Sequence, residues 1–92
     1  MQLVRFRHKG LSELFLTGKS AKVAAGLQKR TRNMLDSLNQ ATDLRDANLP
    51  GFNFHPLYGN PVRYSIHVNG PWCITFEWVD GNAVRVDIEQ YH

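Results

Sequence analysis

Three alternating segments, separated by two-residue turn signals, constrain the fold of this chain more than any other feature. Apolar residues occupy every second position of 64–68, 72–78 and 84–88, and a period of two is typical of strands with one buried face. The dipeptides Asn69-Gly70 and Asp80-Gly81 separate these segments, and both favour a tight hairpin. We therefore predict an antiparallel meander, because strands joined by short turns pair as antiparallel neighbours.

Two further strands are predicted before the meander. Residues 52–58 alternate after the turn signal Leu49-Pro50-Gly51, and Pro56 favours a place at the sheet edge, because proline cannot donate a ladder hydrogen bond. Alternation over residues 3–7 predicts a short N-terminal strand.

Two helices are predicted between the N-terminal strand and the meander. Residues 11–16 have apolar side chains at helical spacing and end at Thr17-Gly18, where Gly18 suits a C-cap. Ser20 is the expected N-cap of a second helix of about five turns. The apolar stripe of this second helix comprises Val23, Leu27, Met34, Leu35, Leu38 and Ala41.

This order of elements predicts an α+β fold. We expect an N-terminal strand and two helices packed on one face of an antiparallel sheet of four to five strands, forming a single domain over residues 1–92.

The composition excludes several classes of protein. The chain has Cys73 as its only cysteine, which excludes an intrachain disulfide and a cysteine metal cluster. No apolar run approaches the ~18–20 residues of a membrane span, so we expect a cytoplasmic protein without a membrane partner. The net charge of +3 is compatible with nucleic-acid binding but does not establish it.

The parity of the strands assigns polar side chains to one face of the sheet. The even positions of the last three strands are apolar and are expected to face the helices. The opposite face is expected to collect His55, Arg63, Ser65, His67, Arg85, Asp87, Glu89 and Tyr91, with His92 at its margin. Any antiparallel sheet shows a polar face to water, and a strand that simply stops at Tyr91-His92 would need no further explanation.

The kinds of residue on this face suggest acid–base chemistry on a phosphodiester. Histidine exchanges protons near neutral pH, since its reference pKa is about 6.5. Arginine binds phosphate in bidentate fashion, and tyrosine can orient a substrate or stack on a base. The chain lacks a phosphate-binding glycine loop and a His-x-x-x-His helix motif, so no metal or other cofactor is expected. Cys73 is more typical of an inert buried thiol than of a nucleophile.

Basic residues of the second helix offer a second candidate nucleic-acid surface. Lys22, Lys29, Arg30 and Arg32 lie mostly opposite its apolar stripe, where they could contact RNA phosphates. A charged helix face is more often simply solvated.

Several short segments together resemble one protein family. They are Phe6-Arg7-His8-Lys9-Gly10-Leu11 with Phe15 and Thr17-Gly18, Asn48-Leu49-Pro50-Gly51, His55-Pro56-Leu57 with Gly59, Ser65-Ile66-His67-Val68, Trp72-Cys73-Ile74-Thr75-Phe76 with Asp80-Gly81, and Tyr91-His92. The order and spacing of these segments, and the Tyr-His pair at the end, resemble those of the HigB-type toxins of the RelE/ParE superfamily. These toxins belong to bacterial type II toxin–antitoxin pairs.

The resemblance implies a ribosome-dependent endoribonuclease that cuts mRNA during translation, without metal, by attack of the RNA 2′-OH on the adjacent phosphate. It implies His55, Tyr91 and His92 as catalytic residues. His55 or His92 would act as base or acid, and Tyr91 would orient or stack on the substrate. The implied partners are the 70S ribosome, mRNA and a HigA-like helix-turn-helix antitoxin, through which the toxin reaches operator DNA indirectly.

Three positions depart from the family's common pattern. Tyr58 stands where a basic residue is common, Cys73 where arginine is common, and Gln90 where aspartate is common. The missing arginine removes the natural phosphate clamp, and Arg63 or Arg85 is the expected replacement. Loss of one such donor would cost on the order of 10²–10³ in rate.

Two alternatives remain open at this point. One is a non-enzymatic inhibitor of DNA gyrase in the style of the ParE branch, against which His55 and the terminal Tyr-His argue. The other is a degenerate family member that binds its antitoxin but cleaves RNA weakly or not at all, as the three departures would suggest.

Overall fold

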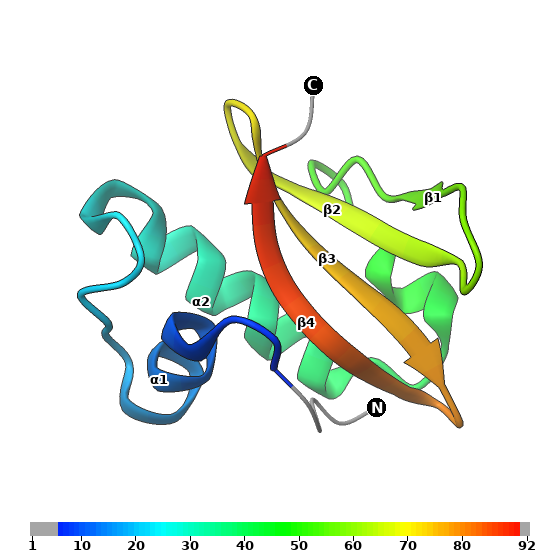
Figure 1. Cartoon of the computed structure of the whole chain (residues 1–92), viewed down its shortest axis with the longest axis horizontal. Helices are drawn as coiled ribbons and strands as arrows, with labels where there is room; N and C mark the ends of the chain where they lie inside the picture. Colours follow the sequence, from blue (N-terminus) through cyan, green and yellow to red (C-terminus); the bar gives the residue numbers. More distant parts are fainter. Residues whose placement is uncertain (1–5, 91–92) are drawn as a thin grey trace.

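Two helices pack against one face of a four-stranded antiparallel sheet, so the predicted α+β arrangement is confirmed (Figure 1). The structure, a computed structural model, describes residues 6–90. The elements in chain order are α1 (Lys9–Thr17), α2 (Ala25–Gln40), the 3-10 helix η1 (Leu44–Ala47), β1 (His55–Leu57), β2 (Arg63–Asn69), β3 (Trp72–Val79) and β4 (Asn82–Gln90). The strands lie in the order β1-β2-β3-β4, each antiparallel to its neighbour. Most of the strand predicted over residues 3–7 falls outside the described residues, and Phe6 forms an isolated parallel bridge with Val86.

Both predicted hairpins are present. Val79 pairs with Asn82, which leaves Asp80 and Gly81 as the two turn residues, at φ 52° and 79°. Positive φ at both positions is the signature of a type I′ turn, whose twist matches that of the flanking strands. The β2–β3 hairpin turns through Gly70. β1 lies at the sheet edge as Pro56 predicted, although it spans three residues instead of seven.

The helix ends follow the predictions in one case and depart from them in another. Gly18 terminates α1 in the left-handed region, and its N–H donates to the carbonyl of Leu14, 2.9 Å away. Ser20 does not cap α2, so that prediction is wrong. The Ser20 hydroxyl instead donates to Glu13 of α1 and accepts from the backbone N–H of Lys22. α2 begins later, at Ala25, and no side chain caps it.

The core lies between the helices and the sheet. The predicted stripe of α2, with Val23 before it and Ala41 after it, is buried throughout, as are Ile66, Ile74 and Phe76 of the sheet. Burying this apolar surface is the main favourable contribution to the free energy of folding.

A bulge in β4 changes the parity near its start. Thr75 pairs with Asp87, but Glu77 pairs with Val84, so one extra residue of β4 lies between these pairs. Arg85 accommodates it with a φ of 51°, a backbone conformation that is uncommon for residues other than glycine. As a result Ala83 is fully buried and Val84 only partly, so the expected core position of Val84 is wrong.

Candidate active site on the second face of the sheet

Four side chains form a row across the face of the sheet opposite the helices. His55 pairs with Ser65, Ser65 with Thr75, and Thr75 with Asp87, so one residue comes from each strand. Directly paired residues of an antiparallel sheet have Cβ atoms about 4.5–5.5 Å apart. The register therefore gathers residues that are far apart in the sequence, as the parity of the strands predicted.

His55 is exposed, yet both of its ring nitrogens have partners. Nδ1 lies 2.9 Å from the backbone carbonyl of Asn53, and Nε2 lies 3.3 Å from the hydroxyl of Ser65. A carbonyl oxygen only accepts, so Nδ1 carries the proton when the ring is neutral, and Nε2 then accepts from Ser65. Asn53 presents this carbonyl from a left-handed conformation, with φ 47°, which asparagine tolerates better than most residues. These contacts hold the imidazole in one orientation.

The sequence contained a signal for Ser65 but none that singled out Asn53. Ser65 belongs to the predicted polar face, and the structure pairs it with His55. Asn53 lies outside β1, and the direction of its carbonyl depends on a backbone angle that alternation does not predict.

Arg63, a candidate phosphate ligand, reaches from β2 across β3 to β4. Its Nη1 lies 2.8 Å from Oε2 of Glu89, and the hydroxyl of Thr75 donates to the same carboxylate oxygen. Both charged side chains are partly buried, with exposed fractions of 29% and 28%. Thr75 itself is fully buried, so this part of the face is an ordered polar network and not a freely solvated surface.

Arg85, the other candidate phosphate ligand, also faces a carboxylate. Its Nε lies 3.5 Å from Oε2 of Glu77, whose side chain is only 11% exposed. A third pair joins Arg7 to Asp87 at 3.9 Å. Each of these three arginines therefore has a carboxylate close by, and a phosphate bound here would compete with those carboxylates for the guanidinium groups.

Cys73 occupies a buried position between His67 of β2 and Glu89 of β4. Burial raises the pKa of the Cys73 thiol, and a hydrogen bond with Ser65 opposes part of this shift. A raised pKa leaves less thiolate at neutral pH, which agrees with the prediction of an inert thiol. His67 contributes to the hairpin, since its Nε2 lies 2.9 Å from the carbonyl of Gly70.

The four basic residues near α2 do not form a uniform free surface. Lys22 pairs with Glu13 at 3.3 Å, and this contact is the main reason that the pKa of Glu13 is lowered. Arg32 donates to the carbonyl of Gly18. Arg30 donates to the carbonyls of Gly51, His67 and Val68. Only Lys29 of this group lacks a polar partner within residues 6–90, so three of the four candidate RNA ligands also have structural roles.

The two predicted catalytic residues at the chain end, Tyr91 and His92, lie outside the described residues. β4 runs to Gln90, so the last residue described directly precedes this pair. Across the described range, 6–90, no cluster of three or more His, Cys, Asp or Glu side chains could hold a metal ion. Neither α1 nor α2 is long and apolar enough to cross a membrane.

Comparisons with known proteins match nearly the whole chain. The model of a family described as "RelE-like toxin of type II toxin-antitoxin system HigB" matches residues 4–92. A protein named endoribonuclease HigB, from Proteus vulgaris, is 36% identical over 88 residues, which cover 95% of this chain and 96% of that protein.

Proposed function

Because this chain belongs to the HigB-like family of RelE-like toxins from type II toxin–antitoxin systems, we propose that it is a toxin that cleaves mRNA. Its relative from Proteus vulgaris carries the name endoribonuclease. The observation on this chain that supports cleavage is the imidazole of His55, fixed by Asn53 and Ser65 at the edge of a polar sheet face. We propose that cleavage depends on the ribosome and takes place in the cytoplasm.

The proposed reaction is a transfer within the RNA chain. A base removes the proton of a 2′-OH, whose oxygen bonds to the adjacent phosphorus while the bond from phosphorus to the 5′-oxygen breaks. An acid protonates that leaving oxygen. The products are a 2′,3′-cyclic phosphate and a 5′-OH end, and no metal takes part in these steps.

We assign the acid and base to His55 and His92, and we assign substrate orientation to Tyr91. Histidine suits both proton transfers because its reference pKa lies near neutral pH. Nε2 of His55 can accept a proton from the RNA only after its hydrogen bond from Ser65 opens, and at 3.3 Å this bond is a long one.

Phosphate binding is assigned to Arg63 and Arg85, which share the face of Ser65 and lie next to Glu89 and Glu77. Arg63 is the better candidate, because its guanidinium is partly buried in an ordered network that would hold it in place. Lys22, Lys29, Arg30 and Arg32 would add longer-range attraction for RNA phosphates.

The proposal is tested by adding wild-type protein to an in vitro translation reaction and mapping the mRNA ends by primer extension. We expect new 5′-OH ends within translated codons, loss of these ends with His55→Ala or His92→Ala, and no cleavage of the same RNA without ribosomes. Intact message in the presence of translating ribosomes would overturn the proposal.

One observation favours a second candidate function, binding of the antitoxin with weak or absent cleavage. Both candidate phosphate ligands are already paired with carboxylates, and Cys73 is small and buried. This candidate predicts that overexpression without an antitoxin leaves growth unaffected. A supercoiling assay with purified gyrase separates either function from that of a gyrase inhibitor.

We also propose a HigA-like helix-turn-helix antitoxin as the partner, with operator DNA reached through it. Membership of a type II toxin–antitoxin family supports the existence of an antitoxin. Co-purification with the product of the neighbouring reading frame tests its identity.

A further inference from the structure

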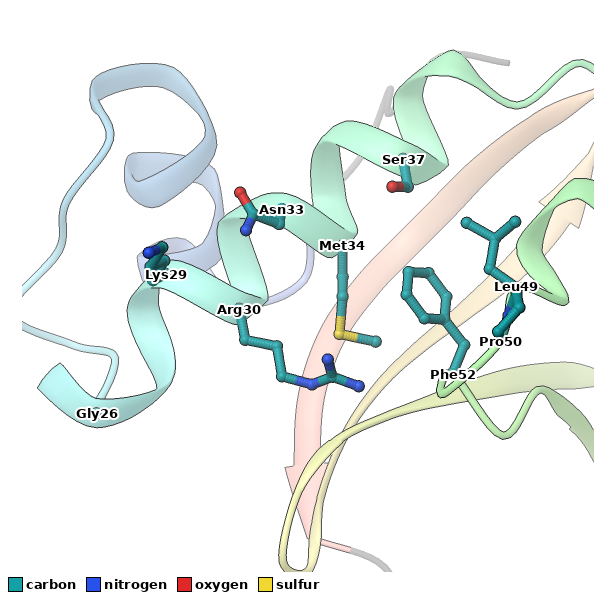
Figure 2. A pocket seen from close by; sticks show the side chains of 9 residues that line it. All are labelled: Gly26, Lys29, Arg30, Asn33, Met34, Ser37, Leu49, Pro50 and Phe52. Atoms are coloured by element: carbon teal, nitrogen blue, oxygen red, sulfur yellow. The ribbon is translucent and has the colours of Figure 1, made fainter.

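An open groove of about 690 Å³ lies between α2 and the loop that precedes β1 (Figure 2). Met34 enters it from α2, whereas Leu49 and Phe52 enter it from the loop. Phe52 belongs to the core, on the helix side of the sheet. The groove is therefore separate from the polar face that carries Ser65 and Arg63.

The floor of the groove is apolar. Met34 and Phe52 are almost fully buried, and their outer edges line the groove beside Leu49, which is 39% exposed. Leu49 is one of the few large apolar side chains that the described residues expose. An exposed apolar side chain above a concave apolar floor favours an apolar side chain from a partner.

The groove is also preformed. The guanidinium of Arg30 donates to the carbonyl of Gly51, 3.0 Å away, and to the carbonyls of His67 and Val68. These bonds connect α2 to the loop and to the end of β2, so both walls are held in place. A groove whose walls are fixed in advance loses less conformational entropy when a partner binds.

The charge of the groove selects an acidic partner. Its only charged lining residues within the described range are Lys29 and Arg30, and both are basic. Lys29 is exposed and has no polar partner among residues 6–90. The groove extends to Gly26, in the first turn of α2, where no side chain caps the helix and no acidic residue lies. A helix N-terminus carries partial positive charge on its free N–H groups and favours a carboxylate.

We propose that this groove binds a segment of the antitoxin in which an apolar side chain is flanked by acidic ones. The apolar side chain would cover Met34, Leu49 and Phe52, and the acidic ones would pair with Lys29 and the start of α2. This inference rests on the proposed function only in that the toxin has an antitoxin partner, and it is independent of RNA cleavage.

Two other occupants fit the groove less well. RNA would place phosphates over an apolar floor, where Nε and Nη2 of Arg30 already donate to carbonyls and Phe52 exposes too little of its ring for base stacking. A second copy of this chain carries a net charge of +3, which opposes association with a basic groove.

The test compares two charge-matched substitutions on α2. Asn33→Glu places a carboxylate inside the groove, whereas Gln40→Glu places one at the exposed end of the same helix, outside the groove. Titration calorimetry with the purified antitoxin should show at least tenfold weaker binding for Asn33→Glu and less than twofold change for Gln40→Glu. Melting temperatures within a few degrees of wild type confirm that both variants fold.

A second substitution tests the apolar contact without a charge change. Leu49→Ala should weaken antitoxin binding at least fivefold. In cells, the antitoxin should also neutralise the toxicity of Asn33→Glu and of Leu49→Ala less well than that of the wild type. Wild-type affinity in both variants, or a wild-type chain that binds no antitoxin, would overturn the inference.

The remaining outcomes separate this inference from other readings. If the groove variants lose RNA binding but keep their affinity for the antitoxin, the groove is an RNA-binding surface and the proposal is overturned. A wild-type dimer in sedimentation that Asn33→Glu dissociates would assign the groove to a second copy and also overturn it. If wild-type protein fails to cleave mRNA while the antitoxin titrations behave as expected, the groove assignment stands and the cleavage proposal falls.

Discussion

Arg63 of β2 spans β3 to reach Glu89 of β4, with Nη1 and Oε2 2.8 Å apart. The two side chains lie over Thr75, whose hydroxyl donates to the same oxygen of Glu89. A charge-assisted hydrogen bond between two partly buried groups is stronger than a neutral one. This network joins three strands on the face proposed to bind RNA, and two predictions depend on it.

The Arg63–Glu89 pair should stabilise the sheet cooperatively. We expect Arg63→Ala to lower the free energy of unfolding by about 1–3 kcal/mol, because it removes a charged partner from a half-buried carboxylate. A double-mutant cycle with Glu89→Ala should give a coupling energy of about 0.5–3 kcal/mol. Urea denaturation measures all four proteins, and additive effects of the two substitutions would show that the contact contributes nothing.

Removing the carboxylate of Glu89 should lessen the competition that a phosphate meets at Arg63. We expect Glu89→Gln to bind single-stranded RNA more tightly at low salt and to steepen the dependence of log K on log salt by about 0.7 for one added phosphate contact. Asp80→Asn makes the same charge change in the β3–β4 turn and serves as the control. Equal gains in both variants would attribute the effect to net charge alone.

His55 should exist as one tautomer when its ring is neutral. The carbonyl of Asn53 only accepts, so we expect the proton on Nδ1. Long-range ¹H–¹⁵N correlation spectra distinguish the two ring nitrogens, and Ser65→Ala should shift the Nε2 resonance while leaving the proton on Nδ1. A neutral ring protonated mainly on Nε2 would contradict the observed contacts.

Tyr58 is a candidate platform for an RNA base. It is fully exposed and lies three residues after His55, on the loop that leaves β1. Aromatic stacking on a base contributes about 1–3 kcal/mol, so Tyr58→Ala should weaken RNA binding by about 5- to 160-fold. Tyr58→Phe preserves the ring and should bind like wild type in a fluorescence titration. Equal losses in both variants would point to the hydroxyl instead.

Cys73 should react slowly with thiol reagents in the folded protein. Burial restricts access, and the raised pKa of the thiol leaves less thiolate at any pH near neutrality. Labelling with iodoacetamide at pH 8 should be at least tenfold slower than in urea, where the pKa returns to its ordinary value. Because the folded-state pKa is raised, the stability linked to this group should fall as pH rises above the unfolded thiol's pKa. Labelling at the unfolded rate would mean that the thiol is accessible.

Much of the fold could be predicted because its signals are local. The turn signals Asn69-Gly70 and Asp80-Gly81, the glycine C-cap at Gly18 and the apolar stripe of α2 each depend on a few adjacent residues. Asp80-Gly81 forms its turn as predicted, whereas Asn69 ends β2 and the other turn is made by Gly70 and Pro71. Strand alternation, another local signal, placed Ser65 on the polar face, which the register confirms. Local rules failed at the start of β4, since the bulge at Arg85 depends on how β4 fits β3.

By itself, the sequence determined which residues form the core face and which share the opposite face, except beside the bulge in β4, because side-chain direction alternates along a regular strand. Only the tertiary structure decided which partner each charged side chain has. The sequence offers three similar basic residues, Arg63, Arg85 and Arg30. In the structure, Arg63 pairs with Glu89, Arg85 pairs with Glu77, and Arg30 donates to backbone carbonyls. The physical reason is that the partner of a charged side chain is whichever group the packing of distant segments brings within hydrogen-bond distance, and alternation along one segment does not predict that packing.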